Sequence, residues 1–201
     1  MATFVLDRAH VAHHEAAHVV VATLRGIPVR YATIRPRRAG HAGVTVLRHP
    51  KTDGPWEGYG AVLAAGPIAD DIYTGITARP NLAHLHEDGD LDLLRLAARQ
   101  VRQETRARRP PTGVEVPRSA SVQAIAALAW REAHDDLVVH YGAVLAVAQR
   151  LLNSRATVTG REIRTLIAGA PPADPERADQ ARDFWPTWFM KNWWVPAPAG
   201  R

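Results

Sequence analysis

Two histidines with a glutamate between them stand near the start of the chain, within the stretch DRAHVAHHEAAHVVVATLRG, residues 7–26. His14 and His18 are four residues apart, so on a helix their side chains lie on one face and can bind one metal ion. Glu15 would lie beside that ion, where its carboxylate can accept a proton from a water molecule. The spacing His-Glu-x-x-His therefore predicts a zinc (Zn²⁺) centre with two histidine ligands and a glutamate general base.

The same short spacing can also arise by chance in a chain that has 10 histidines. The alternative interpretation is a histidine-rich helix whose side chains are solvated or satisfied in the core. His10 and His13 flank the motif, and we interpret both as surface residues or as hydrogen-bond partners of the ligands. Because the chain has no cysteine, any metal must be held by His, Asp or Glu.

A catalytic zinc site needs a third protein ligand and an open position. The extended motif with a third histidine on the same helix fails, because Val21 and Leu24 stand where it requires a glycine and a histidine. A later segment offers other ligands: His84, His86, Glu87, Asp88, Asp90 and Asp92. The alternative for this segment is an acidic cluster that only caps a helix, since carboxylates stabilise helix N-termini.

These residues must be positioned by helices and a small sheet. Asp7 can cap a first helix over residues 8–25, which Gly26 ends. Residues 29–36 and 42–49 are rich in β-branched side chains and predict two short strands joined by a glycine-containing turn. We therefore expect a small β ribbon directly after the histidine helix.

The rest of the folded region is predicted to be helical. Gly142 is expected to bend a long helix, and Thr159 with Glu162 forms a capping-box pattern at the start of a short one. Apolar periodicity and capping residues predict helices over residues 57–74, 88–106, 119–153 and 159–168. The predicted fold class is mainly α (α+β).

The composition is that of a folded protein. With 201 residues, of which 46% are hydrophobic and 22% charged, the chain can bury a sizeable core. The net charge of +5 comes from arginines without interleaved aromatic residues, so we expect a solvated basic face and no nucleic-acid partner. No apolar run approaches the roughly 20 residues that span a bilayer, so we expect no membrane segment and a cytoplasmic location.

Two regions differ in composition. Residues 1–170 hold the motif and the predicted elements, whereas residues 171–201 form a Pro-rich linker and a tail with four of the six tryptophans. We expect the tail to dock on its own domain or on a second subunit of a homo-oligomer. A separate protein partner and an interfacial membrane contact are the alternatives.

Several blocks of the sequence resemble, in order, the peptidase domain of the FtsH-type ATP-dependent zinc metalloproteases. They are HHEAAHVVVA, VRYATIRPRRAGHAGVTVL, LAAGPIADDIYTG, GDLDLLRLAARQV and WREAHDDLVVHYGAVLAVAQRLLNSRATVTGREIRTLI. The likeness spans about residues 8–168. It implies that His14 and His18 bind zinc, that Glu15 is the general base, and that Asp90 is the third ligand.

The resemblance implies a zinc-dependent metallopeptidase that acts on peptides or unfolded protein segments. We expect Gly43, Val44, Thr45 and Val46 to bind the substrate backbone, because an exposed strand edge can pair with an extended peptide. The sequence contains no Walker A glycine loop, so we expect an FtsH-like peptidase domain without an ATPase of its own. The alternative function is a non-catalytic metal-binding interaction module that acts through the Trp-rich tail.

Overall fold

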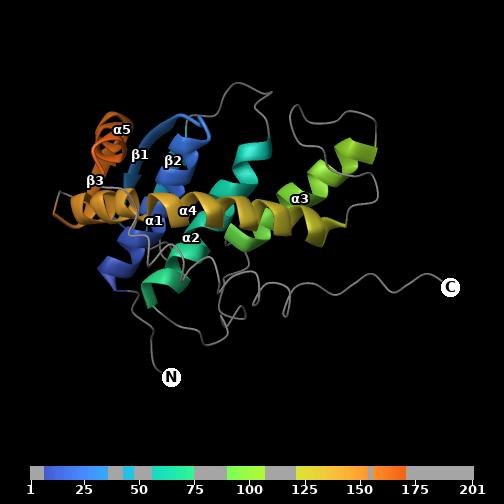
Figure 1. The fold of residues 1–201 in the computed structure, drawn as a ribbon, viewed down its shortest axis with the longest axis horizontal. Coiled ribbons are helices and arrows are strands. Elements are labelled where there is room, and N and C mark those ends of the chain that lie inside the picture. The colour runs from blue at the N-terminus through green and yellow to red at the C-terminus, as the bar shows by residue number, and fades with distance from the viewer. Residues whose placement is uncertain are drawn as a thin grey trace.

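A computed structural model of the protein describes residues 7–35, 43–47, 56–74, 90–106, 121–153 and 156–170. These residues form a mainly helical structure with one small antiparallel sheet (Figure 1). The elements are α1 (Arg8–Leu24), β1 (Val29–Thr33), β2 (Val44–Leu47), α2 (Trp56–Thr74), α3 (Asp90–Arg106), α4 (Val122–Asn153), β3 (Thr157–Thr159) and α5 (Gly160–Ala168). The mainly α fold class expected from the sequence is confirmed.

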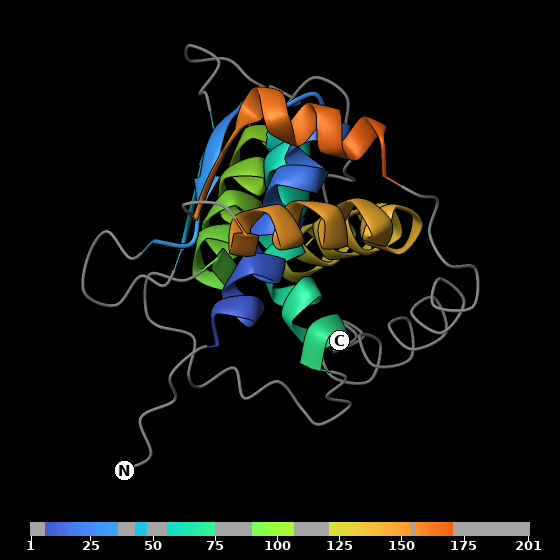
Figure 2. The same cartoon turned by 90° about the vertical axis from the view of Figure 1, so that its left-hand side faces the viewer.

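Helix α1 passes through the middle of the fold, enclosed by α2, α4 and the sheet (Figure 2). Asp7 caps it as expected, since its carboxylate accepts a hydrogen bond from the backbone N–H of Ala9 at 3.3 Å. The helix is followed by Gly26 with φ +69°, a left-handed conformation that glycine adopts readily. All residues from 15 to 22 are buried. Polar groups on this stretch therefore need partners inside the protein.

Helix α2 packs closely against α1 because the residues that face it are small. Six of the nine buried positions described for this helix are alanine or glycine: Gly60, Ala61, Ala64, Ala65, Gly66 and Ala69. Small side chains at a helix contact let the two axes approach. This close approach brings polar groups of α2 within reach of the histidines on α1.

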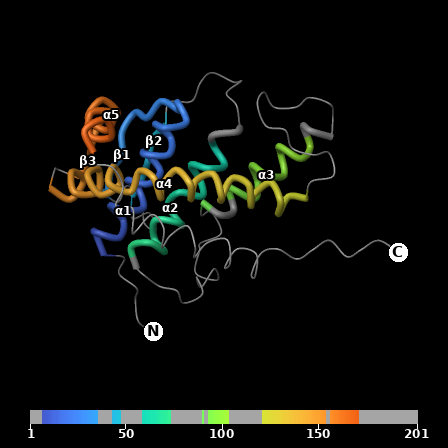
Figure 3. Tube along the Cα trace, viewed as in Figure 1, coloured from blue at the N-terminus to red at the C-terminus, as the bar shows by residue number. Residues whose placement is uncertain are grey.

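Helix α4 runs along the molecule, with the sheet and α5 near one end and α3 beside the other (Figure 3). Its backbone leaves helical geometry at His140, with φ −114° and ψ 23°. The bend thus lies within two residues of Gly142, where it was expected. At the end of α1, the Arg25 guanidinium pairs with Glu132 at 3.0 Å and Asp136 at 2.8 Å, which ties α1 to α4.

The sheet has three strands in the order β2-β1-β3, all antiparallel. The expected two-stranded ribbon is therefore incomplete, because residues 157–159 add a third strand to β1. Three residues are too few for an alternating pattern to stand out, and their partner lies far away in the sequence. The expected strand over residues 29–36 is also too long, since β1 ends at Thr33.

The predicted start of the last helix is confirmed. Thr159 Oγ1 accepts a hydrogen bond from the backbone N–H of Glu162, and the Glu162 carboxylate accepts one from the backbone N–H of Thr159. These two bonds form the capping box.

Some predicted features lie outside the described residues. They are the tail over residues 171–201, the side chain of Asp92, and the segment with His84, His86, Glu87 and Asp88. Among the helices in the described part of the chain, none is long and apolar enough to cross a membrane.

Candidate metal centre

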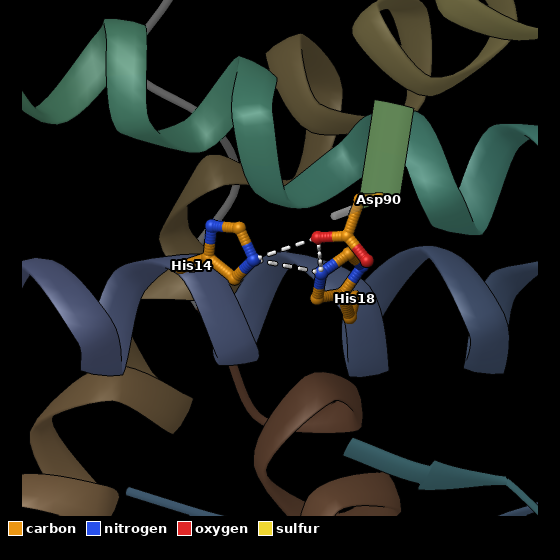
Figure 4. A group of neighbouring side chains, drawn as sticks. All are labelled: His14, His18 and Asp90. Carbon is orange, nitrogen blue, oxygen red and sulfur yellow. Dashed lines mark hydrogen bonds and ion pairs between the residues drawn. The ribbon is translucent and has the colours of Figure 1, made fainter. Parts of the chain in front are cut away.

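Three side chains from two helices converge on one point (Figure 4). His14 and His18 project from α1, and Asp90 is the first residue of α3. Asp90 Oδ2 lies 3.0 Å from His14 Nε2 and 3.1 Å from His18 Nε2, and the two nitrogens are 3.0 Å apart. This group could hold a metal ion. The residue that only a family resemblance selected as third ligand thus lies beside the two histidines of the motif.

The spacing of the three donor atoms suits a small tetrahedral ion. Zinc bonds of about 2.0–2.1 Å at tetrahedral angles place ligand atoms about 3.3 Å apart. The observed separations of 3.0–3.1 Å lie within a few tenths of an ångström of that value. Two imidazole nitrogens and one carboxylate oxygen are also a donor set that zinc favours.

The hydrogen-bond partners of the histidines decide which ring nitrogen carries the hydrogen. His18 Nδ1 lies 2.6 Å from the backbone carbonyl oxygen of Val62, which can only accept, so this nitrogen donates. His14 Nδ1 lies 2.8 Å from Asp70 Oδ2 and donates to that carboxylate. In a neutral imidazole the other nitrogen is then unprotonated. In their neutral form, both histidines therefore have the lone pair of Nε2 on the side of the ring that faces Asp90.

Electrostatics at this point favour a positive charge. Burial lowers the pKa of His14, but Asp70 and Asp90 outweigh burial and raise this pKa well above its ordinary value. Burial also lowers the pKa of His18, but Asp90 outweighs burial, so this pKa is raised above its ordinary value. For Asp90 itself, burial is outweighed by the two histidines, which hold the pKa of the carboxyl far below its usual range. The two carboxylates that favour a proton on the imidazoles would also favour a metal cation in the place of that proton.

Asp70, on α2, binds the ring nitrogen of His14 that points away from the donor group. The sequence analysis did not predict this role. Asp70 Oδ1 lies 2.8 Å from His10 Nε2, and Asp70 Oδ2 accepts a hydrogen bond from His14 Nδ1. Burial raises the pKa of Asp70, but His14 and His10 lower it to about 2, so the carboxylate is ionised near neutral pH. The spacing in the sequence gives a partial signal for this role. Asp70 lies four residues after Gly66, so both residues lie on the same face of α2.

The flanking histidines are not members of the donor group among the described residues. His10 lies 2.8 Å from Asp70, so it reaches His14 only through this carboxylate and does not contact a potential ligand directly. His13 donates from Nδ1 to the carbonyl oxygen of Ala9 at 2.7 Å, and its ring centroid lies 4.4 Å from that of Tyr73. Of the four histidines on α1, His14 and His18 are thus potential ligands, His10 contacts Asp70, and His13 contacts Ala9 and Tyr73.

Because Gly66 has no side chain, the imidazoles of His14 and His18 can occupy the space beside it. A Cβ atom at this position would lie 2.5 Å from His14 Nε2 and would also overlap with His18 Nε2. Any other residue would therefore push the donor atoms away from their common point. The glycine of the AAGPIAD stretch is part of the candidate centre, and the sequence analysis did not single it out.

Glu15 lies beside the donor group and is held by strand β2. Only 6% of Glu15 is exposed, and its Oε2 accepts a hydrogen bond from Thr45 Oγ1 at 2.6 Å. Burial raises the pKa of the Glu15 carboxyl, although His18 and His14 act to lower it. A buried carboxyl group with a raised pKa takes up a proton more readily than an exposed one.

The four residues expected to bind substrate all lie at β2. In the described sheet β2 is an edge strand, paired on one side with β1. Gly43 comes directly before the strand, and Val44, Thr45 and Val46 are within it. Thr45 also contacts Glu15, so this segment lies next to the candidate centre. Pairing of this edge with a peptide stays a prediction.

No protein-family model matches the chain, and the search of curated proteins found no match either. The resemblance to the FtsH-type peptidase domain stays a prediction based on the quoted blocks.

Proposed function

We propose that this protein is a zinc-dependent metallopeptidase that hydrolyses peptide bonds in peptides or unfolded protein segments. The observation that carries the proposal is the convergence of three electron-pair donors, on His14, His18 and Asp90, beside the buried carboxylate of Glu15. The resemblance to the FtsH-type peptidase domain supports the same activity.

The donor set suits a Lewis-acid site. His14 and His18 would bind the ion as neutral imidazoles, and Asp90 would supply the single negative charge. A zinc ion held by this set would keep a net positive charge, which polarises a peptide carbonyl and lowers the pKa of a nearby water molecule.

Glu15 would perform the proton transfers. Its carboxylate takes a proton from the attacking water as the water oxygen bonds to the carbonyl carbon of the substrate. It then delivers this proton to the amine nitrogen as the C–N bond breaks, so one water is consumed and two peptides leave. The raised pKa of Glu15 suits both steps, because the group must accept the proton and then release it.

Strand β2 would bind the substrate backbone. Its edge position in the described sheet allows an extended peptide to pair with it by main-chain hydrogen bonds. Such pairing requires extended substrate, which is why we propose peptides and unfolded segments.

The proposal is tested by metal analysis and by the Glu15→Gln variant. We expect about one zinc per chain in the wild type, as one group of ligands predicts. We expect Glu15→Gln to retain zinc but to cleave a fluorescently labelled unfolded protein about 100- to 10,000-fold more slowly, because general acid–base catalysis contributes that much. The control is Glu162→Gln, which removes a carboxylate from the capping box of α5 and should leave cleavage unchanged.

Three results would count against the proposal. Full activity of Glu15→Gln would contradict the mechanism, and a wild type that binds no zinc would contradict the metal centre. A wild type that binds zinc but cleaves nothing would favour the non-catalytic interaction module.

A further inference from the structure

One side chain of strand β2 faces the proposed base instead of the substrate edge. Thr45 pairs with Ala32 of β1, and its hydroxyl points toward α1. Thr45 Oγ1 donates to Glu15 Oε2 at 2.6 Å. The same hydroxyl lies 3.4 Å from the Glu15 carbonyl oxygen, so the carboxylate bond is much the shorter of the two.

Gly43, two residues earlier, completes the contact between β2 and the Glu15 side chain. A Cβ atom on Gly43 would lie 2.6 Å from Glu15 Oε1, 2.7 Å from Glu15 Cγ and 2.9 Å from Val11 Cγ1. The carboxylate therefore packs directly on the backbone of the strand. Among the described residues no hydrogen bond reaches Oε1.

We propose that Thr45 is a positioning residue for the general base, an inference that rests on the proposed peptidase function. Its hydroxyl donates to Oε2 and holds the carboxylate in one orientation for the proton transfer from water. A flexible glutamate side chain must be held within a fraction of an ångström of its productive position, and a misplacement of 1 Å costs about 100-fold in rate. Strand β2 then has two tasks, with its edge binding substrate and its inner face aligning the base.

A purely structural role makes a different prediction. If the Thr45–Glu15 bond only ties β2 to α1, its loss should lower the stability of the fold by the amount typical of one hydrogen bond, about 1 kcal/mol. It should then leave kcat unchanged. The two roles are separated by comparing kcat, KM and unfolding in the same set of variants.

The first test uses variants of the full-length zinc-loaded protein with and without the hydroxyl. We expect Thr45→Val to lower kcat by about 10- to 100-fold with KM and zinc content unchanged, and Thr45→Ser to retain most of kcat. The control is Thr157→Val, which removes a hydroxyl that donates to Thr33 Oγ1 at 2.9 Å elsewhere in the sheet. Wild-type kcat in Thr45→Val, or equal losses in Thr45→Val and Thr45→Ser, would overturn the proposal.

A second pair covers the case in which valine prevents folding. Thr45→Ser and Thr45→Ala differ only by the hydroxyl oxygen, so equal kcat in these two variants would overturn the proposal. A much lower kcat in Thr45→Ala supports it.

A third measurement needs no activity. In the metal-free protein, the ¹³C signal of the Glu15 carboxylate can be assigned by its absence in Glu15→Gln. We expect the chemical shift of this signal to change in Thr45→Val and to stay the same in Thr45→Ser and Thr157→Val. A signal that does not move in Thr45→Val would overturn the proposal, even if the wild type cleaves no peptide. Failure of the peptidase proposal and failure of this inference are thus distinguishable.

Discussion

Each potential ligand histidine is fixed through the ring nitrogen that points away from the donor group. For His18 the partner is the backbone carbonyl of Val62, which no substitution can remove directly. For His14 the partner is the Asp70 side chain. Such partners set the tautomer and the orientation of a metal-binding imidazole before the ion arrives. The residue whose contribution can be measured is therefore Asp70.

We expect Asp70→Ala to weaken zinc binding by about 10- to 100-fold, the usual effect of losing a hydrogen-bond partner of a ligand histidine. Asp70→Asn should fall between this variant and the wild type, because an amide oxygen can still accept from His14 Nδ1 but carries no charge. Competition with a chromophoric zinc chelator measures the affinity. The control is Asp71→Asn, on the same helix; equal affinities in Asp70→Ala and the wild type would show that His14 needs no support.

At the scale of elements, the centre depends on how closely α1 and α2 approach. Buried alanines on α2 permit the approach, and Gly66 lies where the two imidazoles need room. Two glycines of the same helix, Gly60 and Gly66, are tightly packed, but only Gly66 faces the histidines. This pair allows packing and metal binding to be separated.

We expect Gly66→Ala to abolish zinc binding, because its Cβ would lie 2.5 Å from His14 Nε2. Gly60→Ala is the matched control, since its Cβ would meet Ala129 Cβ at 2.8 Å, away from the site. Overpacking typically costs about 1–3 kcal/mol, so Gly60→Ala should be less stable but keep its zinc. Zinc content and chemical unfolding of both variants provide the check. Zinc retention in Gly66→Ala would contradict the placement of α2.

The capping box at the start of α5 is a second local feature whose contribution to stability can be measured. We expect Thr159→Ala to lower the free energy of unfolding by about 1 kcal/mol at neutral pH. Hydrogen bonds from Thr159 and Arg150 lower the pKa of Glu162, so the carboxylate stabilises the fold above its ordinary pKa. This contribution is lost as the pH falls through the lowered value. The cost of Thr159→Ala should therefore shrink in acid, as urea unfolding at several pH values can measure.

Thr165→Ala is the control for the capping box, because the Thr165 hydroxyl only donates to the Arg161 carbonyl oxygen within the helix. Its effect should be close to zero. An equal loss in Thr159→Ala and Thr165→Ala would show that the box contributes nothing.

At the scale of the whole molecule, the donor group joins two helices that are distant in the chain. His18 and Asp90 are 72 residues apart, so the three donors come together only when α1 and α3 have packed. An ion that binds the folded state and not the unfolded chain must stabilise the fold.

We expect zinc at 100 times its Kd to stabilise the protein by about 2.7 kcal/mol, by mass action. Thermal unfolding with zinc and with a chelator measures this as a rise in Tm. Asp90→Ala should remove the rise. Asp135→Ala, which alters an exposed carboxylate on α4, should keep it. A zinc-dependent rise in Asp90→Ala as large as in the wild type would exclude Asp90 as a ligand.

The sequence by itself determined the features that depend on neighbouring residues. The cap at Asp7, the capping box at Thr159 and the bend near Gly142 follow from local propensity and hydrogen bonding, and the structure has all three within two residues. The placement of His14 and His18 on one helix face is equally local, because it depends only on the helical repeat.

Tertiary structure alone decided which distant groups meet these residues. The contacts of Glu15 with Thr45, of His14 with Asp70 and of His18 with Asp90 span 30, 56 and 72 residues. The sequence analysis missed the first two, and it selected Asp90 from several acidic residues only through a family resemblance. The third strand was missed for the same reason. Contacts of this kind depend on how helices and strands pack in three dimensions, whereas a helical or strand pattern specifies only the face that each element presents.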